Sequence, residues 1–186
     1  MITEPIIKEM HKAIIICLAI LLCNGCIMQP QAIAFLNQYE SEDFSQFNKA
    51  SVFIRGVFEK NFVIFVDAPH LIRDSLNAGC YVVMLDRKSY QVIQSHWMTD
   101  FDVDADTLKL QQLAQALMKY GIPRLSVDEQ ENVFVYLKDV ESLALVRFAN
   151  EEEVEKMRIK YDAIEPHYWK RCWKKARGNW YRYKGS

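Results

Sequence analysis

Asp67 and His70 are the two residues of this 186-residue sequence whose types and spacing best suit catalysis. Asp67 ends the run NFVIFVD, whose β-branched and aromatic residues are typical of a strand, and His70 follows three residues later. A carboxylate and an imidazole this close together would suit the proton transfers of a hydrolase. The interpretation that the spacing favours is structural: Asp67 caps a short helix over residues 68–78, and His70 lies in its first turn.

Alternating carboxylates in the run DFDVDAD form a second candidate site. They are Asp100, Asp102, Asp104 and Asp106. On an extended chain they would share one side and could bind calcium, but a calcium loop counted from Asp102 has Thr107 and Leu113 where glycine and glutamate are required. Acidic residues are also expected before a helix N-terminus because of the helix dipole. We therefore expect no metal site.

Other catalytic and nucleotide-binding motifs are missing from the sequence. The six glycines never have the spacing of GxGxxG or of a P-loop, and the four histidines form no HExxH. Serine, aspartate and histidine occur without the GxSxG context of a catalytic triad. We expect no cofactor, and a binding function is favoured over an enzymatic one.

The C-terminal segment is basic and aromatic. From Val154 onward it holds ten Lys or Arg against three acidic residues, whereas residues 26–153 hold eleven against nineteen. Because exposed aromatic and arginine side chains dominate binding interfaces, we expect Trp180, Tyr181 and Arg182 to bind a partner. Anionic lipid or cell-wall polymer would also suit such a surface, and nucleic acid is not expected as a partner.

A helix is expected immediately before these three residues. It would bury residues at helical spacing, namely Trp169, Cys172, Trp173 and Ala176. The Gly-Asn pair at 178–179 would end it and leave Trp180 and Tyr181 more exposed than Trp169 and Trp173. The alternative is a final edge strand, WYRYK, in which alternate residues pack on a sheet.

The run AIIICLAILLC at residues 13–23 is the most apolar part of the chain. Its eleven residues are too few for a membrane-spanning helix, which needs about 20. They fit the apolar region of an export signal, which has about 7 to 15 residues. A start at Met10 would give this region the short basic leader that such signals have.

The next stretch, LCNGC at residues 22–26, resembles the cleavage motif of bacterial lipoprotein signals. Gly25 matches the small residue before the invariant cysteine, whereas Cys23 and Asn24 depart from the usual pattern. The resemblance covers only the signal segment. It implies cleavage before Cys26, acylation of the Cys26 sulfur and a lipid anchor in the cell envelope, facing the periplasm. The alternatives are a buried apolar helix of a cytoplasmic protein and a short membrane anchor that is not cleaved.

Cleavage at this point would leave Cys80 and Cys172 as the other cysteines of the mature chain. Two cysteines in an oxidising compartment are able to pair. Both lie in apolar patterns, however, where a free thiol packs well. We therefore expect two free thiols.

The rest of the chain predicts a single α+β domain with a mainly antiparallel sheet and several helices. Strands are expected at 51–58, 61–67, 80–85, 89–98, 123–127, 133–137 and 142–148. The clearest helix would begin after Asp106 or Thr107 and bury one apolar stripe, Leu110, Leu113, Ala114 and Leu117. A second helix is expected after Asn150.

Three parts are therefore expected: an export signal at 1–25, a lipid-anchored and partly helical tether at 26–50, and a globular domain at 51–186. The expected function is that of a non-catalytic envelope lipoprotein that binds a protein or polymer partner, for example an immunity or inhibitor protein. Two alternatives stay open. One is an exported hydrolase that uses Asp67 and His70, and the other is a cytoplasmic globular protein with a buried N-terminal helix.

Overall fold

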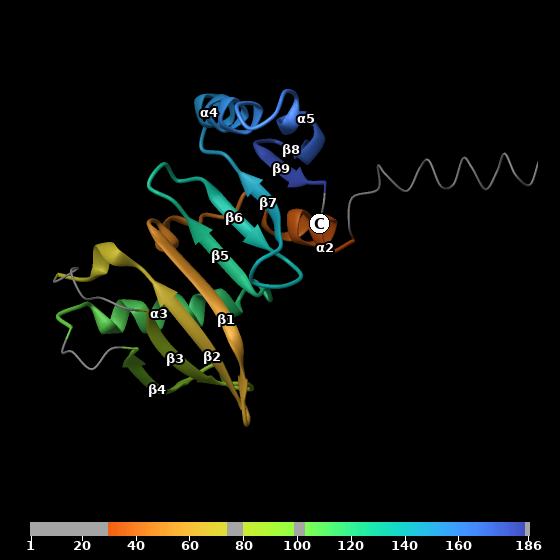
Figure 1. The fold of residues 1–186 in the computed structure, drawn as a ribbon. Coiled ribbons are helices and arrows are strands. Elements are labelled where there is room, and N and C mark those ends of the chain that lie inside the picture. The colour runs from red at the N-terminus through yellow and green to blue at the C-terminus, as the bar shows by residue number, and fades with distance from the viewer. Residues whose placement is uncertain (1–29, 74–79, 99–102, 185–186) are drawn as a thin grey trace, which may run out of the picture.

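The domain is built on one twisted antiparallel sheet, shown in Figure 1. The computed structural model describes residues 30–73, 80–98 and 103–184. Within these ranges the sheet has nine strands in the order β4-β3-β2-β1-β5-β6-β7-β9-β8. The expected α+β class with an antiparallel sheet is confirmed.

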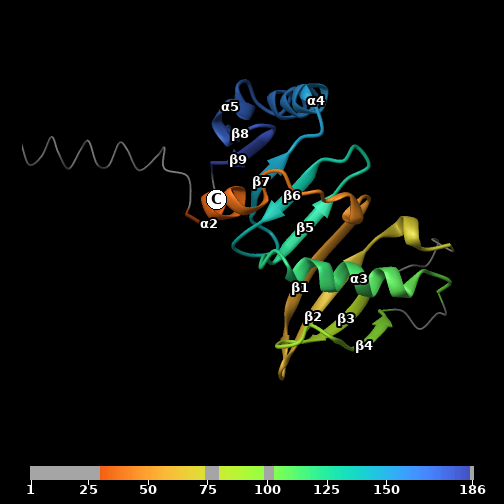
Figure 2. The same cartoon turned by 180° about the vertical axis from the view of Figure 1, so that it is seen from behind.

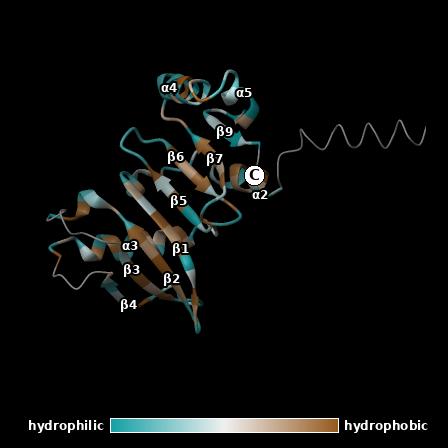
Figure 3. Cartoon of the chain, viewed as in Figure 1, coloured by the Kyte–Doolittle hydropathy of each residue, from teal (hydrophilic) through white to brown (hydrophobic). Residues whose placement is uncertain are grey.

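The strands follow the apolar runs of the sequence. They are β1 (Ala50–Phe58), β2 (Asn61–Asp67), β3 (Tyr81–Asp86), β4 (Val92–Trp97), β5 (Arg124–Val127), β6 (Val133–Tyr136), β7 (Leu143–Arg147), β8 (Trp173–Arg177) and β9 (Trp180–Tyr183). Figure 3 shows apolar residues concentrated along these strands. All seven strands expected before the C-terminal segment are present.

Four α-helices and two short 3₁₀ turns lie in the described ranges. They are α2 (Pro30–Tyr39), α3 (Thr107–Met118), α4 (Glu151–Asp162), α5 (Tyr168–Cys172), η1 (Ser45–Phe47) and η2 (Pro69–Leu71). The expected caps of the two long helices are confirmed: the Asp106 side chain accepts from the Lys109 amide and the Asn150 side chain from the Glu153 amide. No helix in the described part of the chain is long and apolar enough to cross a membrane.

Helices α2 and α3 cover one face of the sheet, as Figure 2 shows. The apolar stripe of α3 lies against β1 to β4, and its buried residues are Leu110, Leu113, Ala114 and Leu117, as expected. The alternate residues of β1 and β5 that point to this side, Val52 and Leu125, are fully buried. This side therefore holds the main core.

Helices α4 and α5 cover only the far end of the opposite face. A second apolar cluster lies beneath them and contains Val146, Phe148, Trp169, Cys172 and Trp173. In the described ranges, no helix covers this face where β1, β2 and β5 form it (Figure 1). The middle of the sheet therefore presents one face to solvent.

The expected tether over residues 26–50 is corrected by the structure. Helix α2 buries Phe35 and Leu36, and the segment after it buries Phe44 and Phe47. All four belong to the main core cluster. The packed domain therefore includes residues 30–50, because their aromatic side chains fill the core beside β9.

The expected C-terminal helix is also corrected. It ends at Cys172, and the chain continues as β8, turns at 178–179 and returns as β9. Gly178 has a φ of +50°, which suits the turn of a two-residue hairpin better than an ordinary residue would. The final segment is therefore a strand, as the alternative held, but β9 lies between β7 and β8 and is not at the edge.

Candidate functional site

Two of the three residues expected to bind a partner, Trp180 and Arg182, are buried. Trp180 is only 1% exposed, less than Trp169 at 7% and Trp173 at 4%. Its Nε1 donates to the carbonyl oxygen of Glu40 at 3.0 Å. The expectation that Trp180 is the more exposed residue is therefore wrong.

Strand alternation explains where the other two side chains go. Tyr181 turns to the second apolar cluster, where its ring centroid lies 5.4 Å from that of Phe148. Arg182 is buried, and its strand register pairs it with Leu145 of the main core. Tyr181 is partly buried, and Arg182 is 9% exposed, only slightly more than Trp169 and Trp173. Strand β9 is therefore buried on the side of Trp180 and Arg182 and partly buried on the side of Tyr181.

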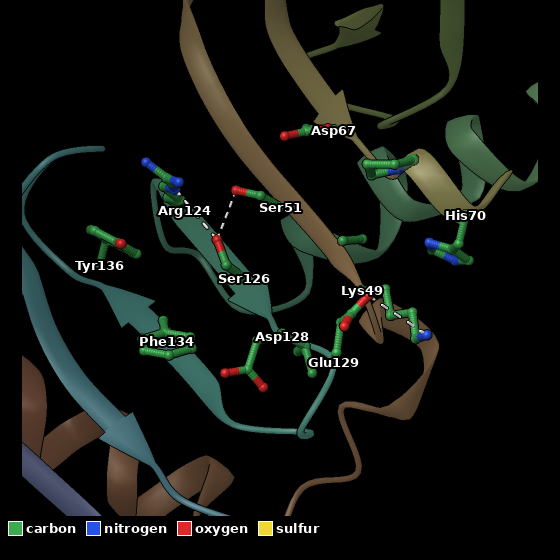
Figure 4. Close-up of a pocket in the computed structure, with 13 residues that line it drawn as sticks. Lys49, Ser51, Asp67, His70, Arg124, Ser126, Asp128, Glu129, Phe134 and Tyr136 are labelled. Carbon is green, nitrogen blue, oxygen red and sulfur yellow. Dashed lines mark hydrogen bonds and ion pairs between the residues drawn. The ribbon is translucent and has the colours of Figure 1, made fainter. Parts of the chain in front are cut away.

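The uncovered face of the sheet offers a different site. A pocket of about 510 Å³ opens over β1, β2, β5 and β6. Strand register places its residues in two adjacent rows: one row contains Asp67, Ser51, Ser126 and Phe134, and the other contains Phe65, Phe53, Arg124 and Tyr136. All but Phe65 and Phe53 line the pocket. Figure 4 shows the polar side chains that turn into it.

Arg124 lies against two aromatic rings at the side of this pocket opposite His70 (Figure 4). Its guanidinium carbon lies 4.7 Å from the ring centroid of Tyr136 and 5.4 Å from that of Phe53. Its Nη1 donates to the carbonyl oxygen of Val140 at 3.2 Å, and its Nε donates to Ser126 Oγ at 3.4 Å. Within the described ranges no carboxylate forms an ion pair with it. The guanidinium is therefore ordered, partly buried and without a charged partner.

Two hydroxyl groups lie beside the guanidinium. The Oγ atoms of Ser51 and Ser126 are 2.7 Å apart, on neighbouring strands (Figure 4). Each hydroxyl has one donor and two acceptor positions, so the pair is able to bind a further polar group. Ser126 Oγ also accepts from Arg124 Nε, and among the described residues no histidine or carboxylate hydrogen-bonds to either hydroxyl.

The rim of the pocket carries acidic and basic groups. Lys49 and Glu129 form a weak ion pair at 3.9 Å. Asp128 accepts hydrogen bonds from the amides of Gln130 and Asn132 and so shapes the β5–β6 turn. The pocket is therefore mixed in charge, with Lys49 and Arg124 against Asp67, Asp128 and Glu129.

Asp67 and His70 both line this pocket, but the structure does not join them. Among the described residues, no hydrogen bond or ion pair involves either side chain, and Figure 4 shows His70 at one end of the pocket, away from the two serines. Asp67 ends β2 and does not cap a helix, since the turn at Pro69–Leu71 has no side-chain cap. The expected cap is wrong, and residues 74–79 of the expected helix lie outside the described ranges.

The two free thiols are confirmed, since Cys80 and Cys172 are both unpaired. Burial, and next the charge of Asp67, raise the pKa of Cys80 to about 11. The Cys80 sulfur lies 3.6 Å from the carbonyl oxygen of Val66. A thiol with so high a pKa is a poor nucleophile at neutral pH.

Only two of the four aspartates of the acidic run lie among the described residues. Asp106 caps α3, as expected for an acid ahead of a helix, and Asp104 pairs with Arg73 at 3.3 Å. Asp100 and Asp102 lie outside the described residues. Cys26, the expected site of lipid attachment, also lies outside them.

The sequence reasoning missed Arg124, Ser51 and Ser126. A signal was present, because polar residues alternate with apolar ones in RLSV and at the start of β1. Alternation shows that one face is polar, but it does not show which strands are neighbours. The pocket exists because residues more than seventy positions apart pair across β1 and β5.

The chain matches no protein-family model, no curated protein and no solved structure.

Proposed function

We propose that this protein is a non-catalytic lipoprotein of the bacterial cell envelope, and that it binds a protein partner through the uncovered face of the sheet. The observation that carries the binding part of the proposal is Arg124. It is partly buried, held between two aromatic rings and without a carboxylate partner in the described ranges. The envelope part rests on the signal-like sequence that ends at Cys26.

A carboxylate of the partner is the group that best completes this site. A guanidinium is able to pair with a carboxylate through two parallel hydrogen bonds, and Nη2 of Arg124 has no hydrogen-bond partner among the described residues. The hydroxyls of Ser51 and Ser126 add polar contacts beside it. Phe134 and Tyr136 supply the apolar and aromatic area that interfaces favour.

The charges on the rim favour a protein over an anionic polymer. Asp67, Asp128 and Glu129 line the pocket along with Arg124 and Lys49. A polymer with many negative charges would be repelled by the three carboxylates, whereas a protein is able to present one acidic side chain within a neutral or basic surface. An immunity or inhibitor protein is one kind of molecule that would bind in this way.

The proposal is tested by chemical crosslinking and recovery of partners from envelope extract. We expect Arg124→Met to reduce recovery of the main partner by about tenfold or more, since loss of one side of a buried charge pair costs several kcal/mol. Arg87→Met is the matched control, because Arg87 also lies over an aromatic ring, that of Phe62, but outside the pocket. Both variants should show cooperative unfolding.

Equal recovery with Arg124→Met and wild type would contradict the proposal. The hydrolase alternative has one observation in its favour, since Asp67 and His70 line the same pocket. Purified protein should therefore also be assayed on chromogenic phosphate and carboxylic esters. Turnover that is lost in both Asp67→Asn and His70→Gln would favour the hydrolase.

A further inference from the structure

Strand β4 forms one edge of the sheet and β8 forms the other (Figure 1). One side of β4 pairs with β3, and no other strand in the described ranges pairs with its outer side. An edge strand presents a row of N–H and C=O groups that are able to pair with another strand. Proteins commonly protect such an edge with charged side chains, so the residues on each edge indicate whether it is closed to pairing.

The two edges of the described sheet differ in charge. β8 contains Lys174, Lys175 and Arg177 among its five residues, and all three side chains are exposed. Pairing of two copies of β8 would bring these cations together. β4 has the sequence VIQSHW, without lysine, arginine or a carboxylate. Ile93 within β4 and Met98 after it are large apolar side chains that are 59% and 57% exposed. The β4 edge therefore lacks the protection that the β8 edge has.

The pairing with β3 shows which backbone groups of β4 point outward. The amide of Met98 donates to the carbonyl oxygen of Cys80 at 3.2 Å. Backbone groups alternate in direction along an antiparallel strand, so those of His96 also turn to β3, and those of Ser95 and Trp97 turn outward. The strand is regular from Gln94 onward, because the register shift lies before it. Ser95 and Trp97 are therefore positioned to form a new ladder.

Side-chain contacts hold this edge in place. Ser95 Oγ accepts hydrogen bonds from the hydroxyl of Tyr81 at 2.8 Å and from Nε2 of Gln111, on α3, at 2.9 Å. The ring centroid of Trp97 lies 4.8 Å from that of Tyr81. His96, between Ser95 and Trp97, is on the opposite face of the strand and is exposed. Because the contacts within one copy already order the strand, pairing costs less conformational entropy.

We propose that β4 pairs antiparallel with β4 of a second copy of this chain, about a two-fold axis at His96. In this register Ser95 of each copy exchanges hydrogen bonds with Trp97 of the other, so both outward-facing residues are paired twice by symmetry. An axis at Ser95 would instead use Ile93, which lies at the register shift. A strand without charge meets no like-charge repulsion from its own copy. One continuous sheet then runs through both copies.

The dimer goes beyond the proposed function and does not rest on it. The pocket that contains Arg124 lies over β1, β2, β5 and β6, whereas β4 is separated from β2 by β3. Arg124→Met should therefore leave the dimer as it is in wild type. A monomeric protein that still recovers its partner through Arg124 would overturn the dimer and leave the proposed function intact.

Sedimentation of the purified full chain over a range of concentrations tests the dimer. Pairing of two edges buries a small area, so we expect a weak, concentration-dependent equilibrium between monomer and dimer. His96→Lys places two cations opposite each other at the axis and should raise the dissociation constant by about tenfold or more. Gln38→Lys adds the same charge at an exposed position of α2 and is the matched control, which should behave as wild type. A monomer at every concentration, or equal dissociation constants in His96→Lys and wild type, would overturn the proposal.

Oxidative crosslinking tests the register. Residue 96 of the two copies would form a pair without backbone hydrogen bonds, with Cα atoms about 4.5 Å apart. This separation is within the range of a disulfide, about 4.4 to 6.8 Å, so His96→Cys should link two copies through this position. Gln94→Cys, on the same face of β4, is the matched control. It would lie opposite Met98 of the second copy and should not link to itself. Mass spectrometry of the linked peptides identifies the bond, and linkage through Gln94→Cys but not through His96→Cys would overturn the proposal.

Discussion

Trp180 donates its indole N–H to the main-chain carbonyl of Glu40, a residue 140 positions earlier in the chain. The same ring lies edge-on to Phe35 and Phe44, with centroids 5.9 and 6.3 Å away. One contact thus fastens the last strand of the sheet to the first described helix and the segment that follows it. The two ends of the domain are one packed unit.

Replacing Trp180 should strongly destabilise the protein. We expect Trp180→Ala to lower the free energy of unfolding by about 3 to 5 kcal/mol, because it leaves a cavity in the core and an unpaired carbonyl at Glu40. Phe58→Ala removes an aromatic ring that is 60% exposed and should have little effect. Denaturant titration measures both, and similar values would contradict the buried role of Trp180.

Truncation should locate the start of the folded unit. Removing residues 1–28 should leave a soluble domain that unfolds cooperatively, because the described core begins with α2. A longer deletion, of residues 1–39, should abolish cooperative unfolding, because it removes Phe35 and Leu36 from the core. Folding that survives the longer deletion would show that α2 is dispensable.

The buried stripe of α3 should account for much of its stability. Leu113→Ala and Leu117→Ala are each expected to cost about 2 to 5 kcal/mol, because both side chains are essentially unexposed. Leu108→Ala, in the same helix but 64% exposed, is the matched control and should change the stability by less than about 1 kcal/mol. Thermal and urea unfolding of the three variants measures these changes. Equal losses of stability in all three would contradict the assignment of the buried face of α3.

The Cys80 thiol should react slowly and only at high pH. Its pKa of about 11, against an ordinary 9.0, lowers the thiolate fraction at pH 8 on the order of a hundredfold. Since the neutral thiol is favoured in the folded state, its stabilising effect is complete below pH 9 and is lost as the pH rises toward 11. Iodoacetamide labelling followed by mass spectrometry, with urea-unfolded protein as the reference, measures this. Equal labelling rates at Cys80 in folded and unfolded protein would contradict it.

Membrane-extracted protein should begin at Cys26 and carry acyl chains. Intact-mass measurement on wild type and on Cys26→Ala is the test, because the variant has no sulfur to acylate at this position. If wild type is found in the soluble fraction as an unprocessed chain without lipid, the envelope part of the proposal is contradicted. The binding part, which rests on Arg124, would not be affected.

The sequence by itself determined the local elements. Short apolar runs rich in β-branched and aromatic residues predicted β1 to β7, and the caps Asp106 and Asn150 predicted the starts of α3 and α4, because these signals act within a few residues. The buried face of α3, which contains Leu113, was also predictable from the sequence, since helical periodicity is a local property.

Only the tertiary structure decided which faces are covered. Trp169 and Trp173 have helical spacing in the sequence, but the chain forms a strand after Cys172. The pairing of β9 with β7 and β8 outweighs the local preference for a helix. Burial of Trp180 depended on α2, and the pocket around Arg124 depended on β1 pairing with β5. The exposure of a side chain and the residues beside it depend on contacts between segments that are far apart in the sequence. The periodicity of one segment carries no information about these contacts.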